Sequence, residues 1–153
     1  MLTYTDIAYK NGPIFSPTFL RKEFFPRLKR LNDTYHEAGV KCLFHSDGNL
    51  MPIMDDLVAA GIDGINPMEV IAGMSIKEVR QRYGHKIFIT GGIDVSQLMA
   101  FGTPEEVRQA CVQAIEYAGG IGYFLGSTTE LHPDIPAENI LAMVEVAHTY
   151  KIG

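Results

Sequence analysis

The most informative segment of this sequence is KCLFHSDGN, at residues 41–49. Residues 41–45 are a short apolar run, typical of a strand that is buried on both faces, and a polar turn follows directly. In a doubly wound sheet of the nucleotide-binding kind, the turn after the first strand is glycine-rich with the spacing GxGxxG. This turn is acidic and lacks that spacing, so the segment favours a barrel of parallel strands over an open sheet.

The same unit, a short strand followed by a polar turn and an amphipathic helix, recurs along the chain. The predicted strands are residues 41–45, 63–66, 86–90 and 121–125. No two-residue hairpin turn is evident, so the strands are expected to run parallel with right-handed crossovers. The predicted fold class is α/β, a single domain over residues 1–153 whose parallel (β/α) units form about half of a TIM (β/α)8 barrel of about 250 residues.

Helix starts are marked by N-cap residues and by prolines in the first turn. The predicted helices begin at Ser16, Pro52, Ser75, Thr103 and Pro136, and the first extends to about Glu37. Ser75 with Glu78, and Thr103 with Glu106, fit capping boxes. Pro26 lies inside the first helix and predicts a kink there.

Charge and composition exclude several classes of partner. The chain has a net charge of -5, from 13 basic and 18 acidic residues, whereas binders of nucleic acid or anionic membranes normally carry a basic patch. No apolar run approaches the ~20 residues that span a bilayer. Cys42 and Cys111 lie in apolar patterns and indicate the buried thiols of a cytoplasmic protein. We therefore expect a small-molecule substrate and no nucleic-acid or membrane partner.

Polar side chains gather where the predicted strands end, which is where parallel α/β proteins place their sites. The leading pair is His45 and Asp47, directly after the first predicted strand. The second-rank candidates, expected to bind substrate at the same edge, are Asn66, Glu69, Asp94, Thr129 and Glu130.

Two interpretations of His45 and Asp47 remain open. The pair can transfer protons, or bind a divalent metal such as zinc if Glu130, Glu69 or His132 supplies a third ligand. Alternatively, Asp47 only caps the helix that follows and His45 closes the barrel interior.

A series of short motifs, taken in order, resembles the uroporphyrinogen decarboxylase superfamily. The motifs are DIAYKNG at 6–12, FHSDGN at 44–49, AGIDGINP at 60–67, GGID at 91–94 and PDIPAENI at 133–140. The resemblance implies a (β/α)8 barrel with its site at the carboxyl ends of the strands, of which this chain is the carboxyl-terminal half.

The resemblance points to two branches of that superfamily. In the cobalamin- or corrinoid-dependent methyltransferases, a His-x-Cys turn and a later Cys bind zinc; His45 matches, but Asp47 and Thr129 stand in place of the cysteines. In the decarboxylases the turn ends in Asp-Gly, as Asp47-Gly48 does, but the late catalytic His falls on Thr129. The essential Asp and the arginines of the decarboxylases lie in the amino-terminal half.

Three functions are compatible with these features. The first is a decarboxylase-like lyase of porphyrin biosynthesis, releasing CO2 from the acetate side chains of a tetrapyrrole. The second is a metal-dependent methyltransferase-like enzyme that uses His45 and Asp47. The third is a non-catalytic half-barrel, because four strands leave two unpaired edges and two copies in a homodimer would restore about eight strands.

Overall fold

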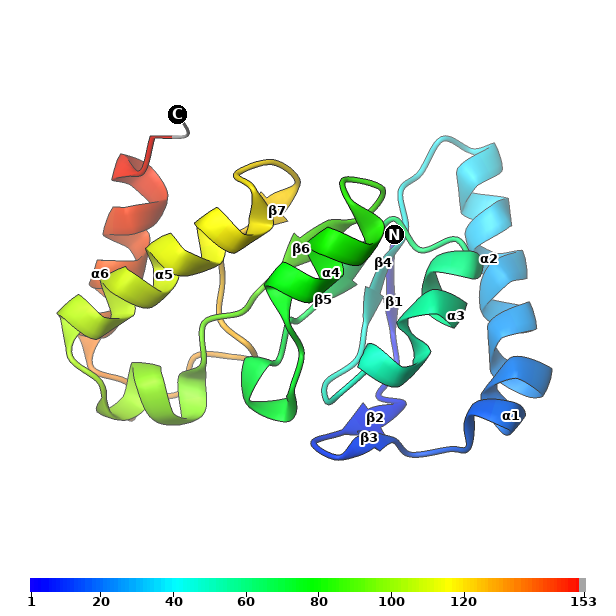
Figure 1. Ribbon diagram of the computed structural model, residues 1–153, viewed down its shortest axis with the longest axis horizontal. Coiled ribbons are helices and arrows are strands. Elements are labelled where there is room, and N and C mark those ends of the chain that lie inside the picture. Colours follow the sequence, from blue (N-terminus) through cyan, green and yellow to red (C-terminus); the bar gives the residue numbers. More distant parts are fainter. Residues whose placement is uncertain (152–153) are drawn as a thin grey trace.

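The computed structural model describes residues 1–151 and contains one five-stranded parallel sheet with helices (Figure 1). The strand order is β1 (Leu2–Tyr4), β4 (Leu43–His45), β5 (Gly64–Asn66), β6 (Phe88–Thr90) and β7 (Tyr123–Phe124). All four strand pairs are parallel. The α/β class and the parallel (β/α) units are therefore confirmed, and the four predicted strands are present with shorter bounds.

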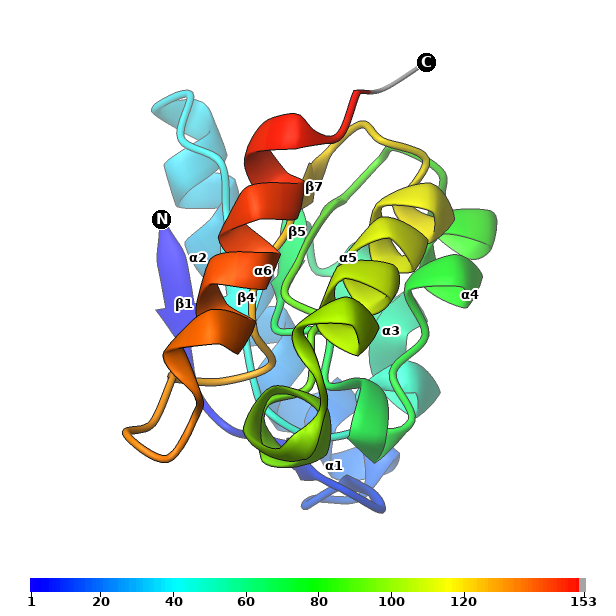
Figure 2. The same ribbon diagram turned by 90° about the vertical axis from the view of Figure 1, so that its left-hand side faces the viewer.

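The fifth strand, β1, is absent from the sequence prediction. It lies beside β4 (Figure 2), and the parallel register sets Tyr4 opposite His45. Three residues are too few to show a strand pattern, and Leu2 and Tyr4 are largely exposed. The expected dimer assumed four strands in each copy, so that two copies would supply the about eight strands of a closed barrel. The sheet has five strands, so this strand count was wrong.

A small hairpin, also missed, precedes the first helix. It pairs β2 (Ala8–Tyr9) with β3 (Gly12–Pro13), antiparallel, through a two-residue turn at Lys10 and Asn11. The expectation that the chain lacks such a turn was wrong for this segment. The hairpin forms its own sheet, so the parallel order of the main sheet is unaffected.

The first predicted helix is built of three parts. They are α1 (Pro17–Phe19), a π-helical turn (Leu20–Phe24) and α2 (Phe25–Glu37). The Ser16 side chain accepts a hydrogen bond from the Phe19 N–H, as an N-cap should. The irregular turn ends two residues before Pro26, whose missing N–H disfavours a regular ladder there.

The remaining helices follow the predicted starts closely. They are α3 (Met54–Ala59), preceded by a 3-10 turn (Met51–Ile53), and α4 (Ile76–Tyr83), α5 (Pro104–Ala118) and α6 (Ala137–Thr149). Shorter turns lie at Val70–Ala72 and Val95–Met99. Thr103 and Glu106 form a complete capping box, whereas Ser75 only accepts the N–H of Glu78. No helix of residues 1–151 is long and apolar enough to cross a membrane.

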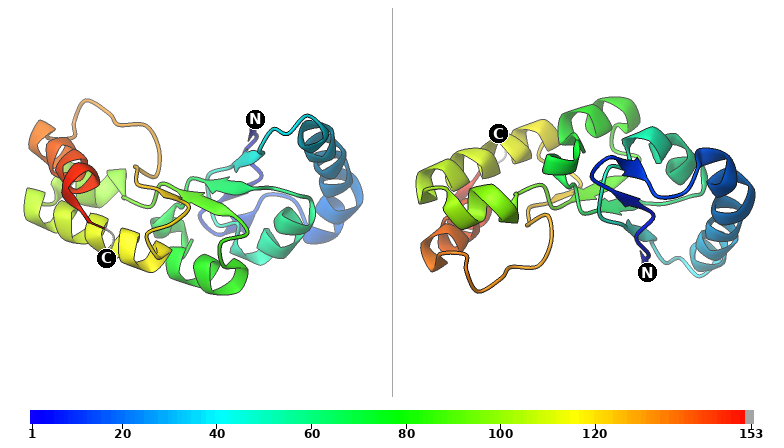
Figure 3. Two further views of the ribbon diagram at one scale, coloured as in Figure 1. Left: turned by 90° about the horizontal axis from the view of Figure 1, so that it is seen from above. Right: turned by 90° about the horizontal axis from the view of Figure 1, so that it is seen from below.

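The two faces of the sheet differ in their cover. Helices cover one face of the sheet (Figure 3). Phe44, Ile65 and Ile89 form one row across the central strands and are fully buried. On the opposite face, Leu2 lies in the row of Leu43 and Phe88, whereas Phe124 lies beside Thr90 in the next row. Leu2 is 49% and Phe124 63% exposed. In a closed barrel this face points inward. The structure is thus a partial barrel with an open inner face.

Candidate functional site

The site is centred on His45 at the edge where β4, β5 and β6 end, called here the carboxyl edge. The register sets His45 beside Asn66, and the His45 Nδ1 lies 2.5 Å from the Asn66 Oδ1. The Asn66 amide nitrogen in turn donates to the Thr90 hydroxyl. Because Asn66 presents its oxygen, His45 donates through Nδ1. In the neutral imidazole, Nε2 then keeps a free lone pair for a proton or a metal.

Tyr4 packs on the imidazole from the neighbouring strand. The two rings are stacked, with centroids 4.5 Å apart and planes 20° from parallel. This contact is not predictable from the sequence, because it depends on the short strand β1, which places Tyr4 beside His45.

Asp6 and Asp47 complete a cluster with His45. The Asp47 Oδ1 lies 4.0 Å from the His45 Nε2, and the Asp47 N–H donates to the Asp6 Oδ1 at 3.1 Å. Buried Ser46 fixes the same segment by accepting the Ile7 N–H at 3.1 Å. One ligand atom each from Asp6, His45 and Asp47 lie within 4.8 Å of one another, which makes a metal site possible. Asp6 was not a predicted site residue; its place in the motif DIAYKNG was the available signal.

The cluster carries unbalanced negative charge. Burial raises the pKa of Asp47, the carboxylates Asp6 and Glu69 raise it further, and His45 lowers it. The Asp47 Oδ1 is sheltered from solvent and has no hydrogen-bond partner among the described residues. Within residues 1–151, no Lys or Arg forms an ion pair with Asp6, Asp47, Glu69 or Glu130. A positively charged ligand would relieve this repulsion.

Glu69 positions the loop that carries Asp47. Its Oε2 accepts the Gly48 N–H at 2.6 Å. Gly48 has a φ of +89°, and an added Cβ would lie 2.4 Å from the Tyr9 backbone nitrogen. The hairpin therefore packs directly on this loop, and only glycine fits at the contact.

Asp47 does not cap the helix that follows it. The side chain that accepts the Met51 N–H, at 3.0 Å, is Asn49. Asp47 is thus free of this structural role in the described residues.

Asp94 has a structural role at the same edge. Its carboxylate accepts the backbone N–H groups of Ser96, Gln97 and Leu98, and the residue is 6% exposed. Burial alone would raise the pKa of Asp94, but these hydrogen bonds hold it below its usual value. Its oxygens are committed to the backbone, and Asp94 is not among the side chains that gather around His45.

The loop after β7 contributes Thr129 and Glu130. The Thr129 hydroxyl donates to the Glu130 Oε2 at 2.7 Å, which lowers the pKa of Glu130, and the charge of His45 lowers it too. Glu130 also adds to the field that raises the pKa of Asp47. Glu130 therefore affects the cluster through its charge. The His132 Nδ1, by contrast, lies 3.8 Å from the Asp134 Oδ2.

Comparisons with known proteins agree on one family. The family model described as uroporphyrinogen decarboxylase (URO-D) matches residues 1–150. A uroporphyrinogen decarboxylase of Actinobacillus succinogenes is 27% identical over 95% of this chain and 38% of its own length. The methylcobamide:CoM methyltransferase MtbA of Methanosarcina acetivorans is 27% identical over 87% of this chain and 37% of its own.

A solved structure shows the same fold. The methyltransferase from Methanosarcina mazei superposes with a TM-score of 0.75 at 22% identity, covering 94% of this chain and 40% of its own. The chain thus spans about two fifths of the length of the relatives named here.

Proposed function

Because this chain belongs to the uroporphyrinogen decarboxylase family, we propose that its carboxyl edge is part of an enzyme active site that binds a divalent cation. The proposed reaction is a methyl transfer, as named for the relative in Methanosarcina acetivorans, assisted here by the bound cation. The observation that carries the proposal is the cluster of carboxylates around His45, which has no basic partner in residues 1–151. Such a site suits a cation better than it suits an anionic substrate.

Each residue of the cluster has a distinct proposed part. His45 Nε2 and one oxygen each of Asp47 and Asp6 are the proposed ligands, with Asn66 holding the imidazole through Nδ1. This set lacks thiolate, so it suits harder cations than a cysteine site does. When bound, the cation would supply the Lewis acidity that activates the methyl acceptor. The substrate pocket would need residues beyond this chain, which spans about two fifths of its relatives.

Metal titration tests the proposal directly. Dialysed protein is titrated with Mn²⁺ and Zn²⁺ by calorimetry, beside His45→Ala, Asp6→Asn and the surface control Asp33→Asn. We expect a site that each cluster variant weakens at least about tenfold and that the control leaves unchanged. Equal affinity in His45→Ala and the parent would contradict the proposal.

A decarboxylase-like activity is the second candidate, favoured by Asp47-Gly48 and by the names of the decarboxylase relatives. Its tetrapyrrole substrate carries acetate groups, which need basic side chains from outside this chain's carboxyl edge. Incubation with uroporphyrinogen tests it, and the absence of coproporphyrinogen would reject it for this chain.

We also propose that a second copy covers the open inner face. Leu2 and Phe124, on the two outermost strands of the sheet, each leave apolar surface exposed on this face, which favours a partner. Light scattering should show a dimer that Phe124→Glu dissociates. Phe101→Glu is the matched control, because Phe101 is 80% exposed at the end of a helical turn. A monodisperse parent monomer would contradict the proposal.

A further inference from the structure

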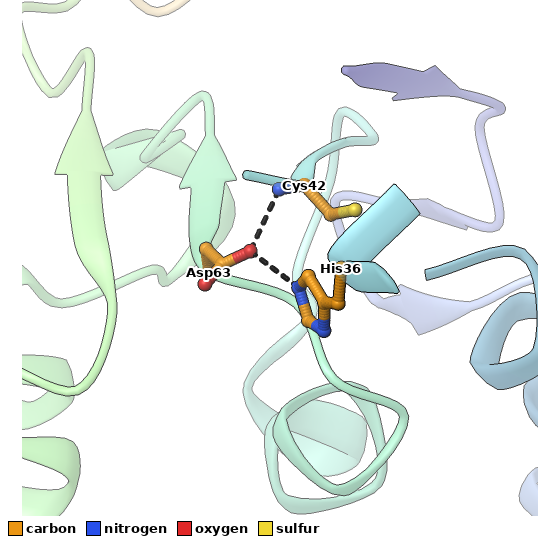
Figure 4. Close-up of side chains that lie close together, drawn as sticks. All are labelled: His36, Cys42 and Asp63. Atoms are coloured by element: carbon orange, nitrogen blue, oxygen red, sulfur yellow. Dashed lines mark hydrogen bonds and ion pairs between the residues drawn. The ribbon is translucent and has the colours of Figure 1, made fainter. Parts of the chain in front are cut away.

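A second cluster lies at the opposite edge of the sheet, where β4 and β5 begin, called here the amino edge. His36, near the end of α2, places its Nε2 2.7 Å from the Asp63 Oδ2 (Figure 4). The Cys42 N–H donates to the same oxygen at 2.7 Å, and the Lys41 Nζ lies 2.8 Å from the Asp63 Oδ1. Two chain segments therefore converge on one carboxylate.

We propose that His36, Cys42 and Asp63 form a second metal site, one for Zn²⁺ or a cation of similar softness. Their ligand atoms, an imidazole nitrogen, a thiol sulfur and a carboxylate oxygen, lie within 4.8 Å of one another. Zinc bonds of about 2.0–2.3 Å place tetrahedral ligands roughly 3.5 Å apart, so closure needs shifts of about 1 Å. The site is independent of the carboxyl edge and of the function proposed for it.

The contacts around the cluster leave the Cys42 sulfur open to a cation. The Cys42 sulfur has only two weak contacts, each 3.9 Å from a backbone oxygen, so a metal would displace little. Lys41 and the Cys42 N–H can stay on Asp63 and orient it, as outer-shell donors do in metal sites. His36 is partly exposed and leaves a path from solvent.

Binding is an exchange of a proton for metal, without a change of redox state. The cation forms bonds to the sulfur, to His36 Nε2 and to Asp63 Oδ2. The thiol proton leaves to solvent, and His36 binds through Nε2 as the neutral tautomer that carries its own proton on Nδ1.

Cobalt provides a signal that separates the two edges, because only a thiolate ligand gives an intense near-ultraviolet charge-transfer band. Metal-free protein is titrated with Co²⁺, and the bound Co²⁺ is then displaced with Zn²⁺. We expect the band in the parent, its loss in Cys42→Ser and an affinity at least about tenfold weaker in His36→Ala. Cys111→Ser is the matched control, because Cys111 is equally buried but belongs to no such cluster within residues 1–151.

Three results would overturn the site: no band in the parent, a band that survives in Cys42→Ser, or unchanged affinity in His36→Ala. The His36→Ala variant keeps the test valid if Cys42→Ser folds poorly, because His36 lies near the helix end with its ring partly in solvent. Circular dichroism without metal confirms the fold of each variant. A failure here leaves the Mn²⁺ and Zn²⁺ titration of His45→Ala unaffected, since that cluster contains no sulfur.

Discussion

The two edges of the sheet use the same residue types with opposite electrostatic results. At the carboxyl edge, Asp47 lies among other carboxylates, and its pKa is raised. At the amino edge, burial alone would raise the pKa of Asp63, but hydrogen bonds from Lys41, the Cys42 N–H and His36 lower it. The carboxyl edge thus carries negative charge that a cation would balance, whereas the Asp63 carboxylate at the amino edge already has its donors, and a metal there must displace the Cys42 thiol proton.

The largest expected effect comes from replacing the glycine under the hairpin. Gly48→Ala should lower the free energy of unfolding by about 3 kcal/mol, because a Cβ at this positive φ collides with the Tyr9 backbone. Gly39→Ala, at the amino edge, is the matched control: its φ is +73° but its Cβ would meet nothing within 4 Å. It should cost about 1 kcal/mol, measured by urea unfolding. An equal loss of unfolding free energy in Gly48→Ala and Gly39→Ala would show that the hairpin does not constrain the carboxyl edge.

Asn66→Leu should weaken metal binding at the carboxyl edge by about 10–100-fold, because it removes the partner of the His45 Nδ1. The Co²⁺ band at the amino edge should not change. Calorimetry and absorption on the same sample measure both sites. A parallel loss at the two edges would mean that the variant disturbs the sheet as a whole.

Removing one charge at each edge should change stability in opposite directions. Asp63→Asn should cost about 1–2 kcal/mol, since it weakens hydrogen bonds from charged and backbone donors. Asp47→Asn should raise stability slightly at neutral pH, because it removes repulsion within the cluster. Urea unfolding in the presence of a chelator measures both. Destabilisation by Asp47→Asn would contradict the difference between the edges.

A further effect, one that depends on pH, is expected at Asp94, a carboxylate of the carboxyl edge that does have donors. Its pKa is lowered in the folded protein, so its stabilising effect is complete above the unfolded value of about 3.9 and is lost as pH falls below it. Asp94→Asn should cost about 1 kcal/mol at pH 7 and less below about pH 4. The free energies of unfolding of the parent and of Asp94→Asn are compared from pH 7 to below about pH 4. If the difference between them does not change with pH, titration of Asp94 is excluded as its cause.

Sequence patterns reveal the elements of this fold better than the contacts between them. The runs that became β4 to β7 are apolar and end in turn residues, so they were predictable. The role of Asp6 was not predictable. Asp6 follows β1 and meets Asp47, 41 positions away in the chain, only through the hydrogen bond from the Asp47 N–H. Asp94 and Asp47 look alike in sequence, as aspartates after strands. Only the backbone path shows that Asp94 caps a helical turn and that Asn49, not Asp47, receives the Met51 N–H.

The row of His45, Asn66 and Thr90 across three strands has an evolutionary consequence. The members are 21 and 24 positions apart in the chain, yet each depends on the hydrogen-bonding group offered by the next. A substitution that reverses donor and acceptor at one position is tolerated only with a matching change on the adjacent strand. Among relatives these three positions should therefore covary as a set, and a lineage that loses His45 should lose the constraint on the other two.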